Sequence, residues 1–175
     1  MQPEKEKYQR LDQRPYESHY LYVDTVIDHP VESVWPHALN IGSWMNAHRL
    51  ATIAGKAGEV GHFERVFPKG VGPEVGLPHY HLYGVTAVVP LKYIALEVLP
   101  EKGGSYGDEK EWMSFDGILL TDMGSRTHVA LLMIDVQMGR RSEEERQRRK
   151  QEIAEGRTLV HQYFENLQQL VGRAG

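Results

Sequence analysis

The polar residues best suited to chemistry in this sequence stand among aromatic residues. Arg65 lies between Phe63 and Phe67. Its guanidinium group carries five donors and could hold a carboxylate or phenolate that an apolar wall would leave unsatisfied. A surface arginine beside Glu64 is the alternative interpretation, because charged side chains are rarely buried without a partner.

Glu97 is the second candidate. A carboxyl group in an apolar cavity can act as a general acid or base. Arg65 and Glu97 could equally form an ion pair with each other across such a cavity, and their role would then be purely structural.

The pattern His79-Tyr80-His81 places two imidazoles on one face of a strand, and His62 belongs to a neighbouring strand. His81 and Tyr80 are candidates for proton transfer. The three histidines could also bind a metal ion, but hydrogen-bonded or solvent-facing histidines explain the pattern as well. Four tyrosines could donate to a carbonyl oxygen or stack on an aromatic ligand, or simply fill the core: Tyr80, Tyr83, Tyr93 and Tyr163.

Strands and helices must position these residues. Runs of β-branched and aromatic residues predict strands over 20–27, 60–67, 79–89, 93–99, 112–121 and 127–138. Pro30 and the apolar spacing after it predict a short helix, followed by a second one that holds Trp44 and Met45.

Ser142 and Glu145 form a capping-box pattern that begins a long helix. The apolar residues of this helix fall on one stripe: Ile153, Val160, Phe164, Leu167 and Val171, widened by Leu159, Tyr163 and Leu170. One strand, two short helices, a run of antiparallel strands and a long helix define an α+β domain. The sheet must curve around the long helix to bury its stripe.

The composition of the chain limits its possible domain organisation, partners and location. The 175 residues suit one domain over 19–175, with 1–18 as an N-terminal arm that is either frayed or a strap over the sheet. A net charge of −4 argues against nucleic acid as a partner. The absence of cysteine fits a reducing, cytoplasmic location, and no apolar run is long enough to span a membrane. No cofactor is expected.

Several stretches resemble a known superfamily. Residues 26–35 (VIDHPVESVW) are similar to the opening of START-like (SRPBCC) proteins, and 58–70 (GEVGHFERVFPKG) to the glycine-loop hairpin of their birch-pollen-allergen branch. The resemblance covers residues from about 20 to 171. It implies the helix-grip fold: a curved antiparallel sheet of six or seven strands around a long C-terminal helix, enclosing a pocket for a hydrophobic or aromatic small molecule.

The resemblance, together with alternation along each strand, predicts which side chains face the pocket. A single β-bulge would reverse the assignment of a strand. The predicted residues are Phe63, Arg65, Phe67, Tyr80, Leu82, Tyr83, Thr86, Tyr93, Ala95, Glu97, Met113, Phe115, Leu119, Val129, Leu131 and Met133, with Val160, Tyr163 and Phe164 from the helix.

The resemblance implies several functions. The first is a cofactor-independent enzyme of the polyketide cyclase, aromatase or lyase type, in which Arg65 and a tyrosine bind an oxyanion and Glu97 or His81 moves the proton. The alternatives are a non-catalytic carrier, a metal-assisted enzyme using His62, His79 and His81, and a chaperone cofactor. Apolar residues in both phases of the last two strands leave the outer face apolar, which a homodimer or the N-terminal arm would cover.

Overall fold

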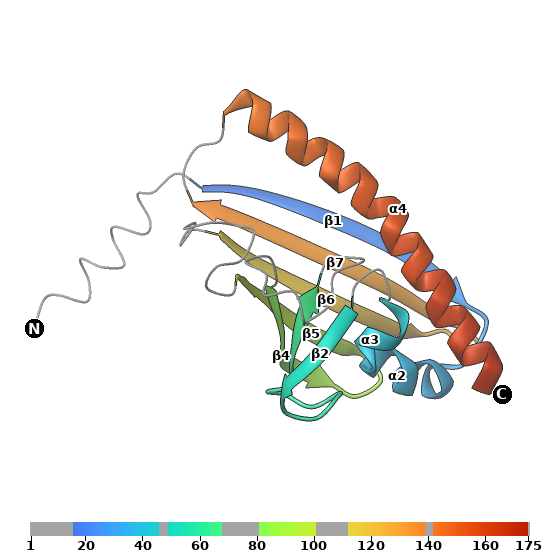
Figure 1. Cartoon of the computed structure of the whole chain (residues 1–175). Coiled ribbons are helices and arrows are strands. Elements are labelled where there is room, and N and C mark those ends of the chain that lie inside the picture. Colours follow the sequence, from blue (N-terminus) through green and yellow to red (C-terminus); the bar gives the residue numbers. More distant parts are fainter. Residues whose placement is uncertain (1–15, 46–48, 68–80, 101–111, 139–141, 175) are drawn as a thin grey trace, which may run out of the picture.

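The computed structural model describes residues 16–45, 49–67, 81–100, 112–138 and 142–174. Its seven strands form an antiparallel sheet in the order β1-β7-β6-β5-β4-β3-β2 (Figure 1). The strands are β1 (Tyr16–Ile27), β2 (Arg49–Ala54), β3 (Phe63–Phe67), β4 (His81–Val89), β5 (Tyr93–Pro100), β6 (Trp112–Asp122) and β7 (Thr127–Met138). The helices are α2 (Val31–Leu39), α3 (Ile41–Trp44) and α4 (Glu143–Ala174).

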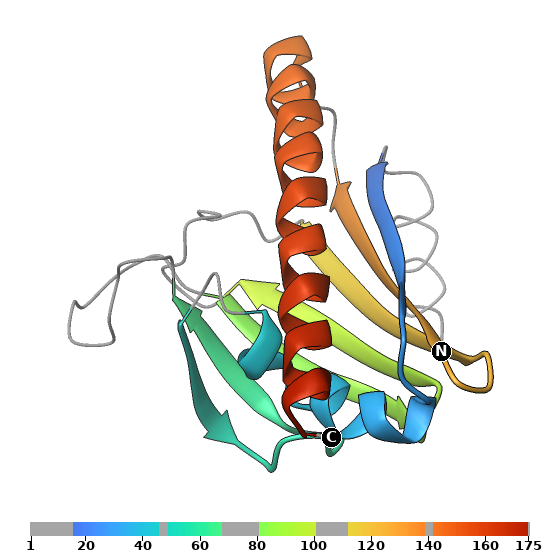
Figure 2. The ribbon, with the colours of Figure 1, turned by 90° about the vertical axis from the view of Figure 1, so that its right-hand side faces the viewer.

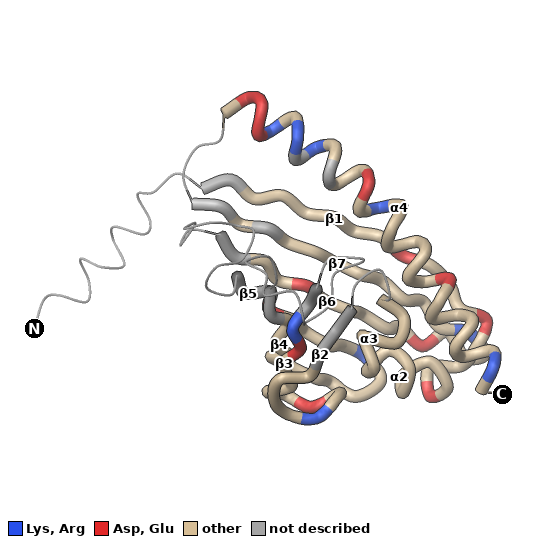
Figure 3. The backbone as a smooth tube through the Cα atoms, viewed as in Figure 1, with Lys and Arg blue, Asp and Glu red and all other residues tan. Residues whose placement is uncertain are grey.

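The long helix α4 crosses one face of the sheet (Figure 2). Its capping box is present as predicted: Ser142 Oγ accepts from the amide of Glu145, and Glu145 Oε2 accepts from the amide of Ser142. Charged residues gather along the first turns, which project past the strands (Figure 2, Figure 3). The second half carries the predicted apolar stripe, which is buried at Val160, Phe164 and Leu167. None of the helices in the described ranges is both long and apolar enough to cross a membrane.

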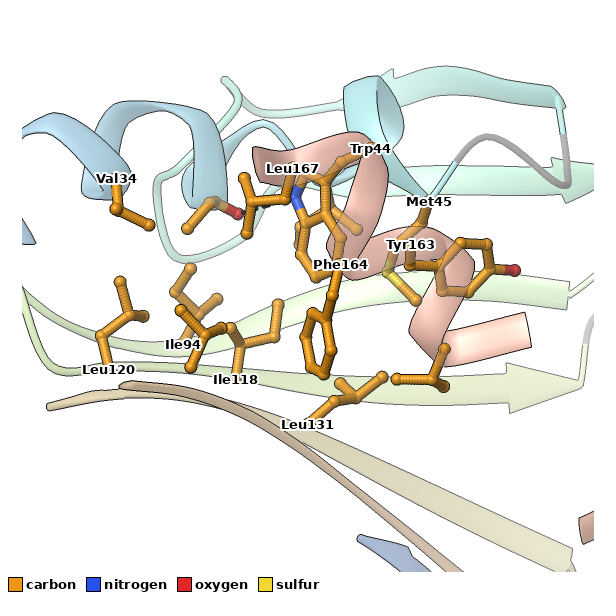
Figure 4. Close-up of a cluster of buried hydrophobic side chains, with 14 of the residues drawn as sticks. Val34, Trp44, Met45, Ile94, Ile118, Leu120, Leu131, Tyr163, Phe164 and Leu167 are labelled. Atoms are coloured by element: carbon orange, nitrogen blue, oxygen red, sulfur yellow. Dashed lines mark hydrogen bonds between the residues drawn. The ribbon is translucent and has the colours of Figure 1, made fainter. Parts of the chain in front are cut away.

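The core forms where α3 and α4 meet the sheet (Figure 4). Trp44 is fully buried, and its ring stacks on Phe164 with centroids 6.3 Å apart and meets the ring of Tyr163 edge-on. The indole Nε1 of Trp44 donates to the carbonyl of Ala38, and Asn166 Nδ2 donates to the carbonyl of Trp44. These bonds hold the two short helices against α4.

The largest differences from the sequence prediction are in β1, β2 and β3. β1 begins at Tyr16, and β2 occupies residues 49–54, for which no strand was predicted. β3 begins at Phe63 rather than at residue 60, because Gly61 has a φ of 87° that a strand does not allow. The predicted helices are confirmed, and residues 1–15 of the predicted arm lie outside the described residues.

Candidate functional site

The face of the sheet that packs against α4 is called the inner face. Ile118 of β6 lies opposite Ile94 of β5 and Leu131 of β7, and all three belong to the core (Figure 4). Side chains two residues apart in a strand point to the same side. Asp116 and Ser114 therefore lie on the inner face, in phase with Ile118.

Asp116 is the unusual residue of this face. It lies opposite Leu96 and Met133 and is only 2% exposed. Neither carboxyl oxygen has a hydrogen-bond partner among the described residues. Most buried polar atoms in folded proteins have a partner, so this carboxyl group is unlike an ordinary structural aspartate.

Burial raises the pKa of Asp116 from its ordinary value of 3.8 to about 7. The nearby hydroxyl groups of Ser114 and Tyr83 lower this pKa in part. Their effect is that of weak contacts, because neither hydroxyl meets an Asp116 oxygen with the geometry of a full hydrogen bond. Asp116 therefore changes protonation state near neutral pH.

Strand pairing brings further polar residues toward Asp116. Tyr83 of β4 lies opposite Glu64 of β3 on one side and Val98 of β5 on the other, and Val98 lies opposite Ser114. The five polar residues of this part of the inner face are called the inner polar cluster: His62, Glu64, Tyr83, Ser114 and Asp116.

His62 and Glu64 form the second part of the cluster. His62 is 5% exposed, and its Nε2 lies 3.0 Å from Oε1 of Glu64. Its Nδ1 is buried without a hydrogen-bond partner in the part of the chain that the structure describes. The carbonyl of His62 accepts from the amide of Val85, and the amide of Gly61 donates to the carbonyl of Val85, both at 2.9 Å. The backbone of His62 is thus fixed to β4.

The expectation that Arg65 and Glu97 face the pocket differs from the structure. Arg65 follows Glu64 in β3, and Glu97 follows Leu96, which is 1% exposed on the inner face. Adjacent residues of a strand point to opposite sides, so Arg65 and Glu97 lie on the outer face. A β-bulge at Val85 to Ala87 shifts the register of β4, and apolar residues in both phases gave no reliable cue to the buried side.

The same correction applies to three aromatic residues. Phe115 is 42% exposed on the outer face, two positions along β6 from Gly117. A Cβ on Gly117 would meet the ring of Tyr93, and one on Gly84 would meet the ring of Phe63, so these rings lie over glycines of the outer face. Phe63, Tyr93 and Phe115 are therefore separated from the inner polar cluster by the sheet itself.

Other predicted residues lie on the inner side. Tyr83 belongs to the inner polar cluster, and five more are buried in the core: Val129, Leu131, Val160, Tyr163 and Phe164. Burial raises the pKa of Tyr163 to about 12, so its hydroxyl group stays protonated; in Figure 4 that hydroxyl points away from Trp44 and Phe164. Whether these residues touch a ligand stays a prediction.

The structure does not describe the side chains of the remaining predicted residues. Tyr80 and His79 lie outside the described residues, as do the side chains of His81, Leu82, Phe67 and Met113 within β4, β3 and β6. Within the described residues, no group of three histidines and carboxylates is arranged to hold a metal ion. The predicted roles of His81 and Tyr80 and the histidine metal site stay predictions.

Sequence analysis missed Asp116, Ser114 and Glu64 as site residues and weighed His62 only as a metal ligand. One signal was present: Asp116 stands in phase with Ile118 and Leu120, so a charged residue continues an apolar series. That series becomes visible only when the inner phase of β6 is known.

Neither a protein-family model nor a curated protein sequence matches the chain. Several solved structures match the chain. Norcoclaurine synthase from Thalictrum flavum, in complex with dopamine and hydroxybenzaldehyde, is 14% identical, with a TM-score of 0.66 over 91% of this chain and 90% of that one. A Mesorhizobium loti protein is 20% identical over 90% of this chain and 99% of its own, with a TM-score of 0.59.

Ara h 8.0201 is 11% identical, with a TM-score of 0.55 over 89% of this chain and 98% of that one. At these identities the likeness concerns the fold alone. The strand order, the two short helices after β1 and the long C-terminal helix agree with it. The chain therefore has the helix-grip fold, the fold that its resemblance to START-like (SRPBCC) proteins predicted.

Proposed function

We propose that this protein is a cofactor-independent enzyme that binds an aromatic or polyketide-like carbonyl compound against the inner face and acts on it by general acid and base catalysis. The observation that carries this proposal is the pair of unpartnered carboxyl oxygens of Asp116 within an apolar face. A buried ionisable group without a partner is typical of a ligand-binding or catalytic position.

Asp116 supplies the acid. With a pKa near 7, a large fraction of its carboxyl groups is protonated at neutral pH and can donate to a carbonyl oxygen of the ligand. The hydroxyl groups of Tyr83 and Ser114 stand beside it as further donors. Donors grouped in this way stabilise the negative charge that develops on oxygen as a carbonyl compound enolises.

The surroundings of Asp116 favour an aromatic ligand. Its neighbours on the inner face are Leu96 and Ile118, each at most 1% exposed, and Met133, and Val85 lies beyond Leu96. Apolar side chains around a few convergent polar groups are typical of small-molecule sites. Norcoclaurine synthase, which shares the fold, was crystallised with dopamine and hydroxybenzaldehyde, an aromatic amine and an aromatic aldehyde. That complex supports an aromatic carbonyl compound as the ligand class.

A carrier protein is the second candidate. Beyond the inner polar cluster the inner face is apolar, with Ile94, Leu96 and Ile118 at most 1% exposed, and such a surface can hold a ligand without changing it. Native mass spectrometry of the purified chain separates the two functions. A copurifying compound that is recovered unchanged after incubation favours the carrier.

Binding of 2-naphthol tests the site directly, because its oxygen and fused rings imitate the enol of a bicyclic ketone that contains an aromatic ring. We expect Asp116→Leu, which keeps the shape and removes the hydrogen bond, to weaken 2-naphthol binding at least about tenfold. Asp28→Asn, at an exposed aspartate before α2, is the control and should bind as the wild type does. Equal affinities for the wild type and Asp116→Leu would refute the proposed site.

A further inference from the structure

Asp116 can hold a carbonyl oxygen, but enolisation also needs a base for the carbon-bound proton. His62 lies on the same row of the inner face. Its carbonyl bonds to the amide of Val85, Val85 lies opposite Leu96, and Leu96 lies opposite Asp116. His62 and Asp116 are thus three strand spacings apart, about 14 Å between their backbones at the usual spacing of about 4.8 Å.

A ligand bound between the two side chains would lie over Val85 and Leu96, which stand between them on this row. Each side chain reaches inward from the sheet, and Val85 and Leu96 between them form an apolar floor with 4% and 1% exposure. A ketone that lies on this floor would present its carbonyl oxygen to Asp116 and the adjacent carbon to His62. His62, directly before β3, and Asp116 of β6 would then act on one molecule although they are far apart in sequence.

The hydrogen bonding of His62 fixes which ring nitrogen is available. Glu64 accepts from the Nε2–H group, and Nδ1 has no partner in the described part of the chain. A buried N–H group without an acceptor is more costly than an unused lone pair. The arrangement therefore favours the tautomer with its proton on Nε2, which leaves the lone pair of Nδ1 available as a base.

We propose that His62, positioned by Glu64, is the general base that removes a proton from the carbon next to the ligand's carbonyl group, so that the substrate is an enolisable ketone or aldehyde that carries an aromatic ring. This inference rests on the proposed function, because it uses Asp116 as the partner acid. Nδ1 takes the proton, and the C–H electron pair forms the C=C bond. The carbonyl π pair moves to oxygen, which accepts the Asp116 proton and gives the enol.

Reversal of this step returns a proton from His62 to carbon and one from the enol to Asp116, so no oxidant or co-reactant is needed. Glu64 does not touch the substrate and is a positioning residue. It keeps the imidazole in one orientation and one tautomer, as carboxylates beside catalytic histidines do.

Deuterium exchange tests this inference on the full chain, with 2-tetralone as the probe and NMR detection of its protons next to the carbonyl. We expect the wild type to exchange these protons faster than buffer does. His62→Gln should lower the enzyme-catalysed exchange rate at least about 100-fold. Glu64→Gln should lower the exchange rate about tenfold with unchanged 2-naphthol affinity. Glu64→Asp, which keeps a carboxylate, should lower the exchange rate less.

Binding of 2-naphthol by the His62 and Glu64 variants confirms that the site is folded and separates the outcomes. Exchange at the wild-type rate in a His62→Gln chain that still binds 2-naphthol overturns the base assignment and leaves the proposed function standing. Binding without accelerated exchange in the wild type also overturns it and leaves a carrier. Binding that Asp116→Leu does not weaken removes the proposed function itself.

Discussion

Asp116 of β6 lies directly opposite Leu96 of β5, and the burial they share makes the stability of the fold depend on the protonation of Asp116. In the unfolded chain Asp116 has its ordinary pKa of 3.8 and loses its proton above that pH. In the folded chain burial raises the pKa to about 7, so the proton is kept until the pH reaches that value. Stability therefore falls as pH rises from about 4 to about 7, and the full unfavourable contribution, on the order of 4 kcal/mol, is present above that range.

We expect Asp116→Asn to remove this dependence. Urea unfolding at pH 5 and pH 8 should show the variant gaining stability relative to the wild type at the higher pH, because an amide does not ionise. Asp28→Asn is the exposed control. A wild type and Asp116→Asn that change in parallel between the two pH values would show that Asp116 is not buried as a neutral acid.

The rate of 2-tetralone exchange should also depend on pH. Since Asp116 acts in its protonated form, the buffer-corrected rate should fall as pH rises through about 7. Asp116→Asn should lower the rate at pH 6, while the amide still donates to the carbonyl oxygen and preserves binding. Glu97→Gln, made in parallel, compares the inner carboxyl with the one that sequence analysis favoured; a larger loss in Glu97→Gln would restore the sequence-based prediction.

Gly55 controls the backbone that carries His62. Its φ is 74°, and an added Cβ would lie 2.5 Å from the carbonyl oxygen of Gly61 and 2.6 Å from the Cα of His62. We expect Gly55→Ala to destabilise the chain by more than about 3 kcal/mol in urea unfolding, since neither backbone atom can move freely. Gly124→Ala, with a φ of 80° and no atom within 4 Å, should lose only about 1 kcal/mol.

Phe164 stacks on Trp44 at the centre of the core. Phe164→Ala should leave a cavity and lower the free energy of unfolding by about 3–5 kcal/mol. Phe115→Ala, on the outer face with 42% exposure, is the matched aromatic control and should lose about 1 kcal/mol or less. Similar losses for the two variants would place the core elsewhere.

The capping box of α4 should act locally. Ser142→Ala removes one of its two hydrogen bonds, worth about 1 kcal/mol at the helix start. The first turns of α4 are largely exposed, so we expect faster amide hydrogen exchange there with little change in the urea midpoint. A fall of several kcal/mol in global stability would contradict this local role.

Much of the fold could be predicted from the sequence. Pro30, the capping box at Ser142 and the apolar stripe from Ile153 to Val171 identify the helices, because these signals are local and follow the periods of helix geometry. The resemblance of residues 26–35 to START-like proteins added the arrangement of the sheet around α4. β2 was missed because its six residues carry little hydrophobic pattern.

The sequence by itself determined the elements and the aromatic, apolar character of the chain; only the tertiary structure decided which side of each strand is inside. Ile118 and Leu119 are both apolar, so hydrophobicity does not select a face of β6, and its pairing with β7 does. The pairing of β5, β6 and β7 places Asp116 on the inner face and Glu97 on the outer face. It also places His62 on the row of Asp116, since cross-strand neighbours are set by register rather than by distance along the chain.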